Sequence, residues 1–213
     1  MLSKRADKLA LGILIVFHLV GLFGILSEWS ELFLSLSPVH LIVAAIILFW
    51  FHPSWDARQA GALFLIFTLS FGLEVLGVKS RVIFGSYDYL DMLGAKALGV
   101  PFVIGLLWVL LVYSTHHILK KYRHRFKPVV LWFFGALMMV GLDALIEPLS
   151  ESLGYWRWEE GSAPPQNFLV WFIAAFVFQA MLAPSQKELA TNKMAFPLFL
   201  LFLLFFFGLN LFL

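Results

Sequence analysis

Cysteine is absent from this sequence, and charged residues are scarce, at 13% of 213 residues. Without a thiol the protein has no cysteine nucleophile, no cysteine-ligated zinc, no iron–sulfur cluster and no covalently attached haem. Soluble domains carry about 25% charged and about 45–50% apolar residues, whereas this chain is 62% hydrophobic. A chain of this length cannot bury so much apolar surface within itself, so we expect much of that surface to face lipid.

Histidine is too sparse for one class of membrane enzyme. Di-iron oxygenases bind two metal ions through many clustered histidines, and this sequence has six. The adjacent pair His116 and His117 would point to different faces of a helix. His18 and His40 suit hydrogen bonds between helices. We therefore expect no histidine-rich metal site.

Long apolar segments account for most of the hydrophobic residues. They are Leu9–Leu26, Phe33–Phe51, Ala60–Val78, Pro101–Leu119, Val129–Glu147, Phe168–Ala183 and Ala195–Leu213. Most approach the length of about 20 residues needed to cross a bilayer, although the sixth is short and Pro38 interrupts the second. The first lacks a small-residue cleavage site after it, so we interpret it as a membrane helix and not as a removable leader. The sequence predicts an all-α, polytopic membrane bundle of about seven transmembrane helices in a single domain, residues 1–213.

The basic residues predict the orientation of the bundle. With seven spans and a cytoplasmic N-terminus, all but four of the 15 Lys and Arg residues fall on the cytoplasmic side. Those on the cytoplasmic side are Lys4, Arg5, Lys8, Arg58, Lys120, Lys121, Arg123, Arg125, Lys127, Lys187 and Lys193. If the second segment only re-entered the membrane, the distribution would be nearly even. The positive-inside rule thus favours seven spans in the cytoplasmic (inner) membrane, with the C-terminus outside.

Three carboxylates lie within the apolar segments, where charged groups are costly and commonly functional. Glu74 lies near the outer end of the third segment, and Asp143 and Glu147 lie one helical turn apart near the outer end of the fifth. The loop after Glu74 adds Asp88 and Asp91. We predict that these five acids gather at one end of the bundle. Simpler interpretations stay open, since Glu147 could mark a helix end and the two loop acids could be solvated.

Two loops on the outer side have an unusual composition. Lys79–Val100 is long, aromatic and glycine-rich, and Pro148–Asn167 contains Tyr155, Trp156 and Trp158. Trp and Tyr commonly form belts at the membrane interface, which is the simplest account of the two tryptophans. Aromatic faces beside buried acids also suit a cationic intermediate, since a π face attracts positive charge.

Several motifs in the middle half of the chain, from about Gly72 to Trp171, occur together in a known family. They are Gly72-Leu-Glu-Val-Leu-Gly-Val-Lys79, Phe84-Gly-Ser-Tyr-Asp-Tyr89, Asp91, Leu93-Gly94, Gly99-Val-Pro101, Asp143-Ala-Leu-Ile-Glu-Pro148, Tyr155-Trp-Arg-Trp158 and Pro165-Gln-Asn167. In this combination the sequence resembles the membrane-integral carotenoid hydratases of the bisanhydrobacterioruberin hydratase and γ-carotene 1′-hydroxylase type. The first two segments and the last carry no recognised motif.

The resemblance implies both a reaction and a set of residues. The reaction is addition of water to the terminal C1′–C2′ double bond of a ψ end group, on an acyclic or monocyclic carotenoid, by a hydro-lyase that needs no cofactor. The positions that match the family motifs are Glu74, Tyr87, Asp88, Tyr89, Asp91, Asp143, Glu147, Gln166 and Asn167. The implied partners are a membrane-dissolved carotenoid, the lipid bilayer and other enzymes of the carotenoid pathway, and no nucleic acid.

Hydration of an isolated alkene needs a neutral carboxylic acid as proton donor, after which water captures a tertiary carbocation. Burial and a nearby like charge both favour the neutral acid, and carboxylates one turn apart can share a proton. We hypothesise that Asp143 donates the proton and that Glu74 or Asp91 positions water. The predicted substrate-binding residues are Phe84, Tyr87, Tyr89, Trp156, Trp158, Gln166 and Asn167.

Two other classes of function stay open at this point: a transporter or proton-coupled channel, and a non-catalytic lipid- or pigment-binding protein. Transport is disfavoured because the acids lie at one end, and residues such as Thr68 and Ser70 are too few to form a polar path to the cytoplasmic half. A non-catalytic protein would not need paired acids near a Gln–Asn step.

Overall fold

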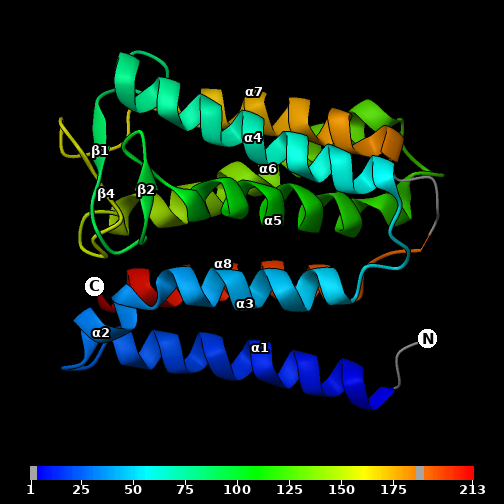
Figure 1. Ribbon diagram of the computed structural model, residues 1–213, viewed down its shortest axis with the longest axis horizontal. Helices are drawn as coiled ribbons and strands as arrows, with labels where there is room; N and C mark the ends of the chain where they lie inside the picture. The colour runs from blue at the N-terminus through cyan, green and yellow to red at the C-terminus, as the bar shows by residue number, and fades with distance from the viewer. Residues whose placement is uncertain (1–3, 186–189) are drawn as a thin grey trace.

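Figure 1 shows the computed structural model of the chain, which describes residues 4–185 and 190–213. Lys187, one of the basic residues assigned to the cytoplasmic side, lies outside the described residues. The elements in chain order are α1 (Lys4–Ile25), α2 (Ser30–Ser35), α3 (Ser37–Trp50), α4 (Ala57–Ser80), β1 (Tyr87–Tyr89), β2 (Lys96–Ala97), β3 (Val100–Pro101), α5 (Phe102–Leu119), η1 (Lys120–Tyr122), α6 (Pro128–Ile146), η2 (Glu147–Leu149), β4 (Trp156–Trp158), α7 (Pro165–Leu182), η3 (Ala183–Ser185) and α8 (Ala195–Phe212).

The described helices form an all-α bundle, as predicted, and the chain is an integral membrane protein. Six of the helices are long and apolar enough to cross a membrane: α1, α4, α5, α6, α7 and α8. The seventh predicted segment is shorter, because α3 has only 14 residues. Figure 1 shows α3 running beside α1 and α8, and it places the N- and C-termini at opposite ends of the bundle.

The break in the second apolar segment lies where the sequence predicted it. α2 ends at Ser35 and α3 begins at Ser37, so that Pro38 occupies the first turn of α3. Proline is tolerated there because the first amides of a helix have no intrahelical partner. The next connection ends at Asp56, whose carboxylate accepts a 2.8 Å hydrogen bond from the Gln59 amide and so caps the start of α4.

α5 is the central helix of the bundle. In its apolar span 67% of the residues are buried, compared with 28–33% in the other five long helices. It packs against α3, α4, α6, α7 and α8, whereas α1 lies at the edge and contacts α2, α3 and α8. Large apolar side chains such as Phe64 and Phe196 remain exposed on the outer helices, as expected where the surroundings are lipid.

A small sheet joins the two long loops that follow α4 and α6. β1 pairs antiparallel with β4, with Tyr87 opposite Trp158 and Tyr89 opposite Trp156. Successive side chains of a strand point to opposite faces, so the tyrosines and tryptophans turn toward the bundle while the charged residues between them are exposed. A second hairpin, β2–β3, leads into α5. The pairing of β1 with β4 places four aromatic side chains over one end of the helices.

Candidate active site

Three of the five predicted acids meet in one buried pocket. Glu74 on α4, Asp143 on α6 and Glu147 on η2 are only 3%, 1% and 9% exposed. Together with Asn167 of α7 they line a cavity of about 20 Å³. We call these three carboxyl groups and Asn167 the acid cluster. Its residues come from elements far apart in sequence, so the cluster exists only in the folded bundle.

Glu74 accepts three hydrogen bonds, all from aromatic residues. The phenol groups of Tyr87 and Tyr89 donate to Oε2 at 2.7 and 2.9 Å, and the indole Nε1 of Trp108 donates to Oε1 at 3.0 Å. Burial, and then the charge of Glu74, raise the pKa of each tyrosine well above its usual value, so both phenols keep their protons and donate. Three donors favour the ionised form of the Glu74 carboxyl group.

Gly77 makes this arrangement possible one turn further along α4. A Cβ at Gly77 would collide with the ring of Phe84 and would lie 3.2 Å from the Tyr87 hydroxyl. Phe84 is buried against that glycine and contacts Tyr87 edge to face, with ring centroids 6.1 Å apart. The glycine therefore lets the loop approach α4 closely enough for Tyr87 to reach Glu74.

Glu147 also accepts three hydrogen bonds. The indole groups of Trp156 and Trp158 donate to its Oε2 at 3.1 and 2.6 Å, and Asn167 Nδ2 donates to its Oε1 at 2.9 Å. The interpretation of these tryptophans as interface belt residues is therefore wrong, because both are buried and bonded to a carboxyl group. The donors favour an ionised Glu147.

Asp143 differs from the other two acids in its partners. Its Oδ2 accepts one hydrogen bond, at 3.1 Å, from the same Asn167 Nδ2 that bonds Glu147. Its Oδ1 is buried and has no hydrogen-bond partner among the described residues. No Lys, Arg or His side chain of the described residues lines the pocket, so three ionised carboxyls would repel one another without compensation. A proton on one of the three groups would relieve this repulsion, and Asp143, which accepts from the fewest donors, is the group best suited to carry it.

Asp88 and Asp91 do not belong to the cluster, which corrects the prediction that all five acids meet. Asp88 is the outward residue of β1 and pairs with Arg81 at 3.0 Å. Asp91 pairs with Lys96 at 2.8 Å, and its side chain is 95% exposed. The hydrogen bond and charge of Lys96 lower the pKa of Asp91. Both residues are solvated surface groups, which is the simpler interpretation that the sequence left open.

Gln166 also lies outside the pocket, although its neighbour Asn167 is at the centre. The Gln166 side chain is exposed and donates to the backbone carbonyls of Val82 and Ile83, at 2.7 Å for Ile83. It thus fastens the start of α7 to the loop that follows α4. The structure assigns Gln166 a positioning contact and Asn167 the contact with both acids.

The sequence analysis missed two tryptophans of the site: Trp171, which lines the pocket, and Trp108, which donates to Glu74. Their rings stack with centroids 4.0 Å apart, and Trp108 is fully buried. A signal was present, because Trp108 lies within an apolar span and away from the interface where tryptophan is usual. The alternating Tyr-Asp-Tyr and Trp-Arg-Trp sequences are likewise typical of strands. Within residues 4–185 and 190–213, no three His, Asp or Glu side chains are arranged to hold a metal ion.

Comparison with known proteins finds a family model and a relative that match this chain. A family model described as "Carotenoid biosynthesis protein" matches residues 36–213, which include every residue of the acid cluster. The chain is 26% identical over 179 residues to the bisanhydrobacterioruberin hydratase of Haloarcula japonica. That alignment covers 78% of this chain and 61% of the relative, so the chain spans less than two thirds of the relative's length. No solved structure matches the chain.

Proposed function

Because this chain belongs to the carotenoid biosynthesis protein family, we propose that it is a carotenoid hydratase that adds water to the terminal double bond of a ψ end group. The observation that carries the proposal is the acid cluster, in which three buried carboxyl groups share one pocket. Among the described residues no cation lines this pocket, and one oxygen, Oδ1 of Asp143, has no hydrogen-bond partner. A buried neutral acid facing an apolar substrate is what alkene hydration needs. The name of the Haloarcula japonica relative, a hydratase, supports the same reaction class.

Proton transfer from Asp143 is the first step of the proposed reaction. The alkene π bond takes the proton at its less substituted carbon, and the Asp143 carboxyl becomes a carboxylate. The positive charge then resides on the tertiary carbon. Asp143 suits this role because the other two acids are held as acceptors by three donors each.

Negative and aromatic groups then stabilise the carbocation. We propose that Glu74 and Glu147 are the ionised members of the acid cluster. They lie in the same pocket, where a low effective dielectric strengthens the attraction of a carboxylate for a cation. The indole of Trp156 lines the pocket as well, and an aromatic face attracts positive charge. These groups are already in place before the charge develops, so little reorganisation is required.

Water capture completes the reaction. A cavity needs roughly 10–15 Å³ to hold one water molecule, and the pocket provides about 20 Å³. The water oxygen forms the new bond to the tertiary carbon, and its extra proton passes to a carboxylate of the cluster. Asn167 donates to both Asp143 and Glu147 and so holds the two carboxyl groups close together. The proton released by water ends on the Asp143 carboxylate, which restores the acid. The sum is one water added, with no change in oxidation state.

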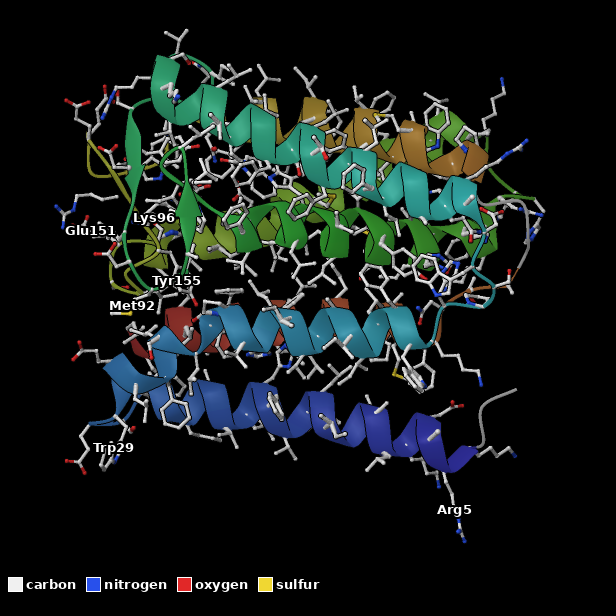
Figure 2. The ribbon with its side chains drawn as sticks, viewed as in Figure 1. Arg5, Trp29, Met92, Lys96, Glu151 and Tyr155 are labelled. Atoms are coloured by element: carbon white, nitrogen blue, oxygen red, sulfur yellow. The ribbon has the colours of Figure 1, made fainter. Side chains whose placement is uncertain are left out.

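The proposal includes an inner-membrane location, a cytoplasmic N-terminus and an outer C-terminus. Figure 2 shows Arg5 at one end of the bundle and Lys96, Glu151 and Tyr155 at the other, which is the end with the small sheet. The positive-inside rule supports a cytoplasmic location for the Arg5 end. The acid cluster would then open near the outer rim of the membrane.

Isotope labelling tests the proposed reaction. Membranes from a lycopene-accumulating host that expresses the protein are incubated in water labelled with heavy oxygen, and the pigments are weighed by mass spectrometry. A hydratase adds the mass of one water molecule and takes the labelled oxygen. Oxygen that comes instead from labelled oxygen gas would contradict hydration, and membranes without the protein are the control.

A further inference from the structure

The bundle contains a second and larger cavity beside the acid cluster. Its volume is about 260 Å³, and its walls come from α1, α2, α3, α5, α6 and α8 and from the outer loops. An apolar cavity of about 150 Å³ accommodates a benzene molecule. The larger cavity, which we call the chamber, therefore has room for a hydrocarbon group well beyond one ring in size.

The chamber and the acid pocket share a wall. Four residues line both cavities: Ile104, Leu107, Ile146 and Trp156. Leu142 also lines the chamber, and it immediately precedes Asp143 on α6. A group inside the chamber is thus separated from the carboxyl groups by one layer of side chains at most, with the Trp156 indole at the junction.

The opposite side of the chamber faces lipid. Val16, Phe17 and Val20 of α1 line it and are also exposed at the bundle surface. Leu36 and Val39 line it from the start of α3 and are exposed too. The chamber therefore opens between α1 and α3, at the edge of the bundle, and its mouth consists of apolar side chains.

The lining indicates what the chamber can hold. No Asp, Glu, Lys or Arg is among the described residues that line it. Its hydroxyl groups satisfy each other, since Ser37 Oγ and Tyr155 Oη are 3.0 Å apart. His40 Nε2 lies 3.3 Å from His18 Nδ1. A phospholipid headgroup would leave its charge unpaired there, whereas a hydrocarbon end loses nothing and gains burial.

We propose that the chamber binds the terminal isoprenoid part of the carotenoid, which enters sideways from the bilayer between α1 and α3 and reaches the acids past Trp156. This inference rests on the proposed function for the identity of the occupant. The remainder of the long polyene stays in the mouth and in the lipid, because the chamber holds only one end. The protein then distinguishes carotenoids by the shape of the end group that enters the chamber, and not by the middle of the polyene.

Pairs of exposed residues at the mouth provide the test. Val20→Trp on α1 and Val39→Trp on α3 place a large ring in the mouth, at positions that are 51% and 50% exposed. Leu19→Trp and Ile42→Trp are the controls, because these residues are 47% and 46% exposed on the same helices and do not line the chamber. All four face lipid, so none should disturb the folded core. Each variant is assayed for lycopene that co-purifies with the protein and for hydrated product.

We expect the two mouth variants to lose at least about tenfold in co-purified lycopene and in product, while both controls match the wild type. Mouth variants that bind and hydrate like the controls would overturn the inference. A different outcome separates the two proposals. If the wild type binds lycopene and the mouth variants do not, but the wild type forms no alcohol, the chamber is upheld and the proposed hydration is refuted. Co-purification of phospholipid that lycopene does not displace would refute the chamber, whatever the hydration assay shows.

Discussion

Two of the buried polar networks lie near opposite ends of the bundle, and they differ in composition. The acid cluster, at the end with the small sheet, contains three carboxyl groups that accept hydrogen bonds from neutral donors. The second, which we call the histidine network, comprises His52, Gln59, Tyr113, His117 and Asn192. It links the end of α3, the start of α4, the second half of α5 and the chain before α8.

The histidine network joins its five residues through hydrogen bonds and contains no carboxyl group. Asn192 Nδ2 donates to Tyr113 Oη at 3.0 Å, and Tyr113 Oη forms a 2.6 Å hydrogen bond with His52 Nδ1. His52 Nε2 then donates to Gln59 Oε1 at 2.8 Å. The backbone amide of Asn192 donates to His117 Nδ1 at 3.0 Å. Such a network stabilises the fold and needs no chemical role.

The difference between the networks separates a structural from a chemical use of buried polarity. In the histidine network nearly every donor meets an acceptor, the His117 Nε2 atom being an exception among the described residues. In the acid cluster, no Lys, Arg or His among the described residues lines the pocket, and Asp143 Oδ1 has no hydrogen-bond partner among those residues. We expect substitutions in the histidine network to change stability and substitutions in the acid cluster to change the reaction.

Asp143→Asn should have the largest effect on activity. The variant keeps the shape of the side chain and can still accept from Asn167, but it has no acidic proton. General acid catalysis contributes roughly 100-fold or more, so we expect hydrated product to fall at least that far while the thermal unfolding temperature in detergent stays close to that of the wild type. Product within a few-fold of the wild type would remove Asp143 from the role of donor.

Glu74→Gln should reduce turnover less. It removes a negative charge that stabilises the cation, although Glu147 remains. We expect a loss of roughly tenfold, at the small end of what electrostatic groups contribute. Product is measured per amount of folded protein, with Tyr89→Phe as a companion that removes one donor to Glu74 and leaves its charge. An equal loss in both variants would argue that the hydrogen bonds matter and the charge does not.

Asn192→Ala should change stability without changing the chemistry. It removes the side-chain donor to the Tyr113 hydroxyl and to the Leu48 carbonyl, and the acceptor of the Met194 amide, all in a buried site, which costs about 2 kcal/mol. We expect a lower unfolding temperature and an unchanged turnover per folded molecule. A specific loss of turnover would show that the histidine network takes part in the reaction.

Asp91→Asn should have the smallest effect. Lys96 lowers the pKa of Asp91, so what little the pair contributes to stability is present at neutral pH and is lost as the pH falls through the lowered pKa. The side chain is almost fully exposed, and exposed pairs contribute little. Activity and unfolding temperature at neutral pH should equal those of the wild type. A marked loss of product would restore Asp91 to the site.

Much of the fold follows from the sequence because lipid imposes a simple rule. A segment in the bilayer must satisfy its backbone internally, so each apolar run became helical, and the second run broke at Leu36, just before Pro38. The acids of α4 and α6 could be predicted because a buried charge in an apolar segment is rare. That these acids meet could be predicted as well, because they lie at the ends of α4 and α6 that the sequence places on the same side of the membrane.

The remaining features depend on contacts that no single segment encodes. The error over Asp88 arose because its exposure is set by the pairing of β1 with β4, which joins loops about 70 residues apart. The same pairing brings Trp156 and Trp158 into place as hydrogen-bond donors to Glu147. The chamber could not be predicted either, since its walls come from helices and loops that meet only in the folded bundle.

Infrared spectroscopy of the purified protein at neutral pH tests most directly whether Asp143 holds the proton. Solvated carboxyl groups are ionised at that pH, so a carbonyl band of a protonated carboxylic acid reports a buried one. We predict that the wild type shows such a band, that Asp143→Asn abolishes it and that Glu74→Gln retains it. A band that persists in Asp143→Asn, or that disappears in Glu74→Gln, would contradict the assignment of Asp143 as the acid.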